Sequence, residues 1–305
     1  MLMRCDTETI ARLEETAYQI RRLSLEMITY GRWGHIGGAF SAAEILACLY
    51  FHAMRIDPGN PKWEKRDRFV LSKAHASPAL YAALALRGFF PVEEVYSYCE
   101  WGGRLEGHTD MTRTPGLEAS GGSLGQGLSL CVGMALGFRF KENAHNRVFC
   151  LLGDGECNEG QVWEAAMAAA HYHLDNLIAI VDYNKVMAKG FVWDLMSIEP
   201  FAEKWRAFGW EVLEVDGHDI EELLRALHQA RYVKVRGKPI VLVAHTVKGR
   251  GVEDAEFNYK WHTQAPDPDV ADAMLRELAR RYGRPEEGYS RLNDPVAKEK
   301  FYAGE

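Results

Sequence analysis

The sequence has no excess of basic residues and no long apolar run. Among its 305 residues, Lys and Arg number 36 against 43 Asp and Glu, which gives a formal net charge of -7. Because it contains no run of five or more basic residues, we expect no binding to nucleic acid. No apolar stretch reaches the roughly 20 residues of a membrane span, and the N-terminus lacks a signal-peptide core. These absences predict a cytoplasmic protein with no membrane contact.

Cysteine motifs are also absent. The six cysteines form no C-x-x-C, and no pair has the spacing of a zinc site. We therefore expect free thiols that pack as small apolar side chains, which suits a reducing compartment. The composition, 47% apolar and 26% charged, is typical of a globular protein and excludes wholesale disorder.

Segments of strand and helix character alternate along the chain. An amphipathic helix over 9–30 precedes a Gly-rich connector at 34–38, and Ser41 with Glu44 forms a capping box that would open a helix at Ile45. The predicted strands are 68–72, 147–152, 177–182, 211–215 and 239–244. The other main predicted helices are 78–87, 159–171, 198–208, 219–231 and 268–282. Apolar strands separated by helices predict an α/β fold, a three-layer αβα arrangement on a doubly wound, mostly parallel sheet. We expect one domain over 1–283 and a polar tail over 284–305.

Polar residues follow two successive predicted strands. Gly153-Asp154-Gly155 ends the first, and Asn184 lies just beyond the second. Ligands of doubly wound sheets bind outside the carboxyl ends of the strands, where an acid and an amide can converge on Mg²⁺. Gly155 would let a backbone N–H approach a diphosphate oxygen. A plain Asp-Gly turn with a solvated Asn is the alternative for either motif alone, but the pair favours a metal site.

Two further features are weaker. Ser120–Gly127 is a Gly-rich loop that runs into a helix, and such a loop can hold an anion or a cofactor ring, although close helix packing explains it equally well. Four of the eleven histidines, His35, His75, His108 and His262, lie in connectors or at element ends. Together they suggest a site that binds a polyhydroxylated substrate and moves protons near neutral pH.

Taken together, these residues resemble the N-terminal, diphosphate-binding half of transketolase. Gly153-Asp154-Gly155 with Asn184 is similar to the thiamine diphosphate motif of that superfamily. The other matching blocks, in order, are Gly34–Gly38, Leu71–Ala76, Gly107-His108, Ser120–Gly127 and Trp261–Pro266. The resemblance covers roughly residues 10 to 270 and implies the thiamine diphosphate-binding fold, with this chain as its diphosphate-binding domain.

The resemblance also implies roles for individual residues. Asp154, Asn184 and the carbonyl of Val186 would bind Mg²⁺. Gly155 and His75 would contact the diphosphate of the cofactor, and Gly122 and Leu124 would lie against its aminopyrimidine. His35, His108 and His262 would line the substrate channel. Glu159 is similar to the acid of the family that links the cofactor sites across the subunit interface.

Three positions depart from the family pattern. Thr109 follows His108 where Pro is usual, Ala188-Lys189-Gly190 lacks the usual acid before Gly, and Thr263-Gln264 follows the channel histidine. We expect all three to lie near the path of the sugar. They leave the cofactor assignment intact and point to an unusual sugar phosphate or a sulfo-sugar as the alternative to an ordinary ketose phosphate.

The chain ends where a full transketolase would continue. The missing half carries the glutamate that activates the aminopyrimidine, the aromatic clamp on that ring and most sugar-phosphate contacts. The resemblance therefore implies a split enzyme that pairs with a C-terminal transketolase subunit carrying the pyrimidine-binding domain, in a dimer of heterodimers in which this chain alone is inactive. Less favoured alternatives are the alpha subunit of a 2-oxo-acid dehydrogenase, deoxyxylulose-phosphate synthase and a non-catalytic cofactor-binding subunit.

Overall fold

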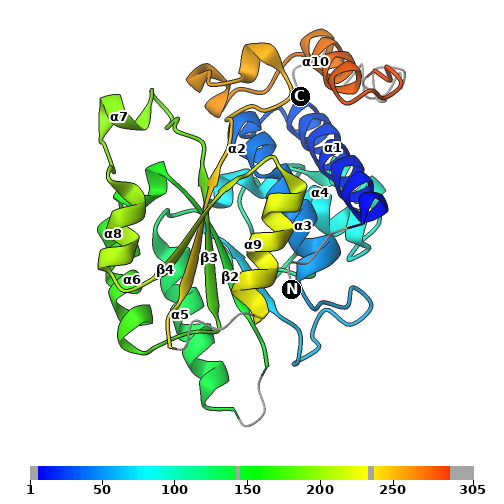
Figure 1. Ribbon diagram of the computed structural model, residues 1–305. Helices are drawn as coiled ribbons and strands as arrows, with labels where there is room; N and C mark the ends of the chain where they lie inside the picture. Colours follow the sequence, from blue (N-terminus) through cyan, green and yellow to red (C-terminus); the bar gives the residue numbers. More distant parts are fainter. Residues whose placement is uncertain (1–5, 142–144, 233–236, 289–305) are drawn as a thin grey trace.

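The centre of the molecule is a five-stranded, wholly parallel sheet in the order β1-β2-β3-β5-β4 (Figure 1). The computed structural model describes residues 6–141, 145–232 and 237–288. The strands are β1 (Arg68–Leu71), β2 (Val148–Gly153), β3 (Leu177–Tyr183), β4 (Glu211–Asp216) and β5 (Ile240–His245). β2 and β3 are buried on both faces, as a parallel sheet covered by helices requires.

Helices cover both faces of the sheet. One face carries α1 (Thr7–Tyr30), α2 (Ile36–Ser41), α3 (Ala43–Cys48), α4 (Ser77–Arg87) and α9 (Ile220–Tyr232). The other carries α5 (Gln126–Arg139), α6 (Gly160–His171) and α8 (Phe201–Ala207). Successive side chains of β2 alternate between the two cores, because Phe149 and Leu151 pack with the first set and Cys150 and Leu152 with the second.

Shorter elements complete the chain. α10 (Pro268–Arg281) packs against α1 through Tyr18, Leu278 and Ala279, and the two helices lie together at the top of Figure 1. α7 (Val192–Leu195) follows the loop beyond β3. The remaining short helices are η1 (Leu49–Ala53), η2 (Ala74–Ala76), η3 (Val92–Ser97), η4 (Gly155–Asn158), η5 (Glu253–Ala255) and η6 (Tyr259–His262).

The alternation of strands and helices predicted from the sequence is confirmed, with one local error. The expected connector at 34–38 is mostly the start of α2, and the expected capping box at Ser41 does not form. Ser41 Oγ instead donates to Asp182 Oδ2 at 2.6 Å, and Glu44 pairs with Arg21. Tertiary partners for both side chains therefore outweigh the local capping pattern.

Cys131, Cys150 and Cys157 are buried free thiols, as predicted, and Cys48 is buried as well, whereas Cys99 is exposed. Within the described residues, no helix is both long and apolar enough to cross a membrane. Most of the tail expected over 284–305 lies outside the described residues.

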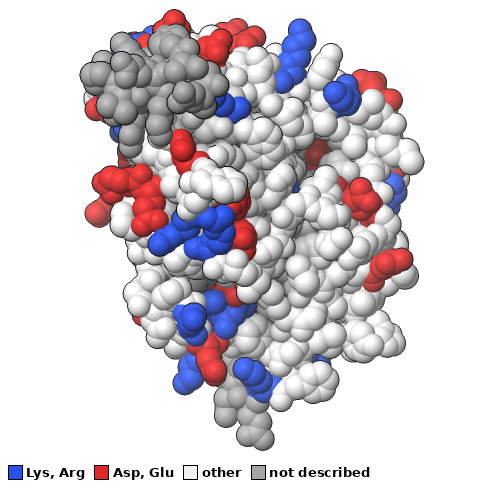
Figure 2. All heavy atoms as spheres, turned by 180° about the vertical axis from the view of Figure 1, so that it is seen from behind, with Lys and Arg blue, Asp and Glu red and all other residues white. Residues whose placement is uncertain are grey.

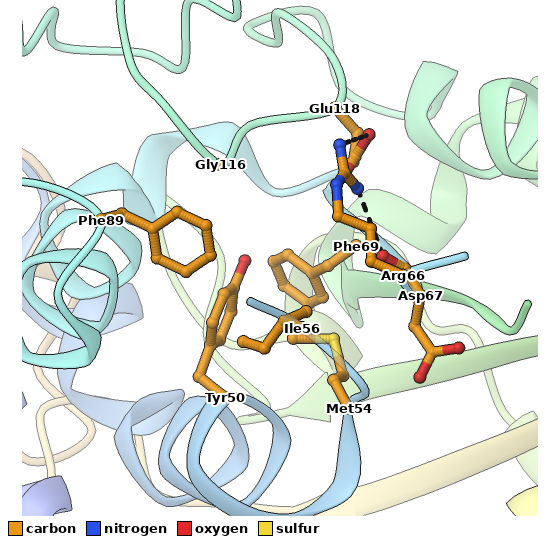
Figure 3. A pocket seen from close by; sticks show the side chains of 9 residues that line it. All are labelled: Tyr50, Met54, Ile56, Arg66, Asp67, Phe69, Phe89, Gly116 and Glu118. Carbon is orange, nitrogen blue, oxygen red and sulfur yellow. Dashed lines mark hydrogen bonds and ion pairs between the residues drawn. The ribbon is translucent and has the colours of Figure 1, made fainter. Parts of the chain in front are cut away.

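A small cavity lies beside β1, between Tyr50, Phe69 and Phe89 on one side and the ion pair of Arg66 with Glu118 on the other (Figure 3). Its volume of about 10 Å³ is room for one water molecule at most. It is therefore a packing defect closed by an ion pair rather than a ligand site.

Candidate functional site

A cavity of about 350 Å³ opens at the carboxyl ends of the central strands. Every residue predicted for the cofactor, the metal or the substrate channel lines it, although these residues are widely separated along the chain. These residues are His35, His75, His108, Gly122, Leu124, Asp154, Gly155, Glu159, Asn184, Val186 and His262. The fold thus brings the predicted cofactor, metal and channel residues together in one place.

Asp154 follows β2 directly and is 2% exposed. Its Oδ1 accepts the Gly155 N–H at 2.7 Å, and its Oδ2 accepts the Lys185 N–H from the loop beyond β3. Burial, and then the neighbouring charge of Asp182, raise the pKa of Asp154 to about 7. A buried carboxylate held by two backbone donors is suited to bind a cation.

Asn184 and Val186 face the same cavity from the loop beyond β3. Asn184 Oδ1 accepts the Val186 N–H at 3.2 Å, which leaves this amide oxygen a second lone pair. The described residues contain no group of three His, Cys, Asp or Glu side chains that could hold a metal by themselves. The donor set here, a carboxylate, an amide oxygen and a carbonyl, is the oxygen-only set of Mg²⁺, which usually completes its coordination with phosphate oxygens and water.

Gly155 allows the loop beyond β3 to lie close to the end of β2. A Cβ at residue 155 would lie 2.8 Å from Met187 Cγ. Its N–H, expected to point toward a diphosphate, is taken here by Asp154 Oδ1. The glycine therefore has a packing role in addition to the anion-binding role predicted for it.

Asp182 and Lys73, to which the sequence analysis assigned no role, lie beneath the site. Asp182 is fully buried and accepts from Lys73 Nζ, Ser41 Oγ and Asn184 Nδ2 through one oxygen, and from Thr246 Oγ1 through the other. Burial opposes its charge, but Lys73 and these donors hold the pKa of Asp182 below its usual value. This network fixes Asn184 and places a buried cation beside the predicted diphosphate site.

The Gly-rich loop is anchored by Glu156, another residue that the sequence analysis missed. Glu156 is 3% exposed, and its Oε1 accepts from the Gly125 N–H at 2.8 Å and from Ser72 Oγ, while Oε2 accepts the Gly153 N–H at 2.9 Å. Gly125 has φ 81°, and a Cβ there would lie 2.7 Å from Glu159 Cβ. Glycine is required at this turn for both reasons.

The four connector histidines form one cluster. The ring of His35 lies 5.1 Å from His75, 5.1 Å from His262 and 6.1 Å from His108. Burial, followed by nearby positive charge, lowers the pKa of His35 to about 4 and that of His262 to about 3. Burial also lowers the pKa of His75 and of His108. These imidazoles are therefore neutral at neutral pH and can exchange hydrogen bonds or protons with a hydroxylated ligand.

Lys248 is a further residue that the sequence analysis missed. Its Nζ lies 2.7 Å from the Val186 carbonyl, 3.1 Å from the Met187 carbonyl and 2.9 Å from His262 Nδ1. Burial and the charge of Lys73 lower its pKa to about 7. The sequence does not identify this lysine as a site residue, because its partners come from two other segments of the chain.

The three departures from the family pattern occupy different positions. Thr109 is buried, and its carbonyl accepts the Gly121 N–H at 2.9 Å; it does not line the cavity itself, although His108 before it does. Ala188 lines the cavity, whereas Lys189, Thr263 and Gln264 are exposed. Glu159 and Leu124 are also exposed at the edge of the cavity.

Comparison with known proteins shows the family. Residues 13–290 match the family model of the thiamine diphosphate binding domain of transketolase. The chain is 45% identical to the 6-deoxy-6-sulfo-D-fructose transketolase subunit SqwG of Clostridium sp. (strain MSTE9), over 87% of this chain and 96% of that protein. It is 40% identical to one of the subunits of the apulose-4-phosphate transketolase of Phocaeicola vulgatus, over 88% of this chain and 94% of that protein.

Full-length transketolases match over part of their length. The human transketolase is 38% identical, over 90% of this chain but 43% of the human protein. The crystal structure of transketolase from Campylobacter jejuni superposes with a TM-score of 0.84 at 30% identity, over 97% of this chain and 46% of that one. The chain thus spans less than half the length of these two proteins.

Proposed function

The chain belongs to the transketolase family, and on that premise we propose that it is the N-terminal subunit of a two-chain transketolase. In this proposal the complex transfers a two-carbon ketol unit from a ketose phosphate to an aldose or aldose phosphate. One observation carries the proposal: the residues proposed for the diphosphate half line one cavity, on a chain that matches two transketolase subunits over most of their length but less than half of a full-length enzyme.

Thiamine diphosphate with Mg²⁺ is the proposed cofactor. Asp154, Asn184 and the Val186 carbonyl would hold the metal, since they offer oxygen donors from two adjacent strand ends. His75 and Gly155 would contact the diphosphate, with the buried cation of Lys73 close by. Gly122 and Leu124 would lie against the aminopyrimidine. When bound, the cofactor serves as the electron sink for breaking the carbon–carbon bond of the ketose.

The histidine cluster would handle the sugar. His108 would bind the first hydroxyls of the donor, and His35 with His262 would move the proton of the hydroxyl next to the bond that breaks. Their low pKa values support this assignment, because neutral imidazoles can both donate and accept at neutral pH. Burial of the cluster around one cavity also orients the substrate before reaction.

A second chain would complete the site. The side chains that face outward from α5 and α6 include Leu130 and Met167, which are 44% and 54% exposed. Figure 2 shows that charged side chains are sparse over a broad part of the face turned away from the viewer in Figure 1. Glu159 at the cavity edge would connect cofactor sites across this interface in a dimer of heterodimers.

The test is reconstitution. The chain is co-expressed with the C-terminal transketolase subunit from the same genome, and ketol transfer is measured for the complex and for this chain alone. We expect activity only in the complex, and only with Mg²⁺ and thiamine diphosphate. Ketol transfer by the chain alone, or transfer of a pyruvate-derived acyl group by the complex instead, would contradict the proposal.

Asp154→Ala tests the metal assignment in the same complex. Because the variant removes the carboxylate donor, we expect Mg²⁺-dependent binding of thiamine diphosphate to weaken by about 10- to 100-fold or more and activity to disappear. The matched control is Asp269→Ala, at an exposed position on α10. Full activity of Asp154→Ala would favour a non-catalytic subunit.

A second candidate concerns the sugar. Two relatives that match this chain over most of its length are named for 6-deoxy-6-sulfo-D-fructose and for apulose 4-phosphate. We therefore include 6-deoxy-6-sulfo-D-fructose and apulose 4-phosphate as donors beside ordinary ketose phosphates. A kcat/KM at least tenfold higher for one of the two would identify a specialised ketol transferase.

A further inference from the structure

Trp33 contacts two of the channel histidines. Its ring centroid lies 5.0 Å from that of His35, in a T-shaped arrangement, and 5.4 Å from that of His108. Both histidines line the cavity, whereas Trp33 does not, and 37% of its surface is exposed. A single Trp in a turn matches no motif, so the sequence assigns it no role. Its place beside two site residues calls for one.

The turn that carries Trp33 is fixed against α1. That helix ends at Tyr30, and Arg32 has φ 52°, in the left-handed region that favours glycine. Gly34 has φ 149°, and a Cβ there would lie 2.6 Å from Ile28 Cγ1. Both the backbone conformation and the packing therefore require glycine at residue 34. The indole is thus held on a turn with little freedom to rearrange.

The indole also lies against the backbone just before His108. A Cβ at Gly107 would lie 2.4 Å from Trp33 Cζ3. The same stretch of backbone is held from α4, because Ser77 Oγ donates to the Gly107 carbonyl at 2.7 Å and Tyr81 Oη donates to the His108 carbonyl at 3.0 Å. The backbone at His108 is thus fixed by α4 through hydrogen bonds and by Trp33 through packing.

The side chain of His108 has no such hydrogen bonds. Its ring nitrogens have no hydrogen-bond partner among the described residues. Its nearest ring is that of Trp33, and its other ring contact in the described chain is with His35, at 6.1 Å between centroids. His35 depends less on Trp33, since His75 and His262 each lie 5.1 Å from it. We propose that Trp33 is a positioning residue that holds the imidazole of His108 in its orientation toward the cavity.

The consequence for catalysis rests on the proposed function, in which His108 binds the first hydroxyls of the donor. A hydrogen bond weakens steeply away from linearity, so an imidazole that binds a hydroxyl must be held in direction as well as in place. Placement of the substrate in turn governs the rate of the bound reaction. Loss of the indole should therefore impair use of the donor. Binding of thiamine diphosphate should be unaffected, because Trp33 contacts the channel histidines rather than the residues proposed for the cofactor.

A double-mutant cycle in the reconstituted complex tests whether Trp33 acts through His108. The variants are Trp33→Leu, His108→Asn and the two combined, and kcat/KM is measured for the donor that the wild-type complex transfers fastest. We expect Trp33→Leu to lower kcat/KM by about 10- to 100-fold when His108 is present. When His108 is already replaced, the further loss should be less than about threefold. Equal losses in both backgrounds, or no loss in the first, would overturn the proposal.

Two controls separate positioning from general packing. Trp33→Leu should bind thiamine diphosphate with Mg²⁺ as tightly as wild type does, and a parallel loss of cofactor binding would indicate a structural role instead. Trp63→Leu is the matched variant, because Trp63 is also partly exposed and packs on a side chain, that of Arg55. Trp63 lies ahead of β1, whereas the cavity lies at the carboxyl ends of the strands, so this variant should keep the wild-type kcat/KM.

Gly107→Ala tests the same contact from its other side. Gly107 has no positive φ, so alanine suits its backbone, but the added Cβ would displace the Trp33 ring. We expect a lower kcat/KM for the donor than in wild type, and no further loss when Gly107→Ala is added to Trp33→Leu, which has no indole to displace. Additive losses would overturn the proposal. This variant also serves if Trp33→Leu does not fold.

Proton NMR of the full chain tests the orientation without catalysis. A Cβ at Gly122 would lie 4.0 Å from His108 Cδ2, so we expect a nuclear Overhauser effect between the Gly122 α-protons and the His108 ring. The ring signals are identified by their loss in His108→Asn. The effect should weaken in Trp33→Leu, and an unchanged effect would overturn the positioning role. Absence of ketol transfer by the wild-type complex would instead show that the proposed function is wrong.

Discussion

Glu156 shows how one buried carboxylate can hold separate segments of the site together. It joins three segments, because its oxygens accept from the Gly125 N–H of the Gly-rich loop, from Ser72 after β1 and from the Gly153 N–H at the end of β2. Burial raises the pKa of Glu156, and these donors oppose that shift. Such a residue is costly to alter, since each donor would be left unpaired in the interior.

Replacement of Glu156 by Gln should therefore destabilise the chain. The amide has one acceptor oxygen instead of two, so at least one of the three donors faces an NH₂ group. We expect a loss of about 1–3 kcal/mol in the free energy of unfolding, measured by urea denaturation. Glu164→Gln, an exposed position on α6, is the matched control and should change stability by less than about 0.5 kcal/mol. Equal stability of the two variants would show that the three contacts are not stabilising.

The sequence could identify only part of this site at the level of residues. Asp154 and Asn184 were predictable because each follows an apolar run that reads as a strand. Glu156, Lys73 and Lys248 were not, because each is a single charged residue whose partners are distant in sequence; Lys73 and Asp182, for example, are 109 positions apart. Only the folded chain brings these charges together.

Among the elements, α1 is connected to its neighbours by a buried charge network centred on Glu44 of α3. Glu44 accepts from both Arg21 guanidinium nitrogens, at 2.7 and 2.6 Å, and lies 3.0 Å from His218 Nδ1. His218 Nε2 in turn accepts the Val247 N–H at 2.8 Å, one residue before Lys248. Burial would raise the pKa of Glu44, but Arg21 and His218 lower it to about 2.

This network should make stability depend on pH in acid. The pKa of Glu44 is about 2 in the folded chain, below its ordinary value of 4.5, so its contribution is complete above pH 4.5 and is lost as the pH falls toward 2. A shift of this size corresponds to about 3 kcal/mol at most. We expect Glu44→Gln to reduce the free energy of unfolding at pH 7 and to differ less from wild type near pH 3. A difference independent of pH would contradict the assigned charge.

The elements themselves were largely predictable, and the exceptions have physical causes. The strands and the long helices have clear periodicity, so the sheet and its covering layers follow from the sequence. α2 was missed because Gly37 and Gly38 disfavour a helix, yet Gly37 lies against the Lys248 stem and Gly38 against His75 and Lys73. Small residues are needed at those contacts, and tertiary packing makes the helix.

At the scale of the whole molecule, the residue pattern of α5 is that of a helix that packs against other structure on two opposite sides. One side packs on the sheet through Leu128, Cys131 and Ala135. The opposite side exposes Leu130, Gly133 and Gly137, and nothing lies within 4 Å of a Cβ built at either glycine. Inside this 14-residue helix, these two exposed glycines are each unfavourable by roughly 1 kcal/mol relative to Ala. Close approach of another chain would account for their presence.

Gly133→Arg should therefore prevent assembly without harming the fold of the chain. The arginine has open space in the single chain and a better helix propensity than glycine, so the melting temperature of the isolated chain should not fall. In the two-chain complex, the same side chain would meet the partner surface as an uncompensated charge. We expect light scattering to show a smaller assembly and ketol transfer to be lost in parallel. Gln229→Arg, at an exposed position on α9 across the sheet, is the control and should assemble normally. An intact, active complex with Gly133→Arg would place the partner on another face.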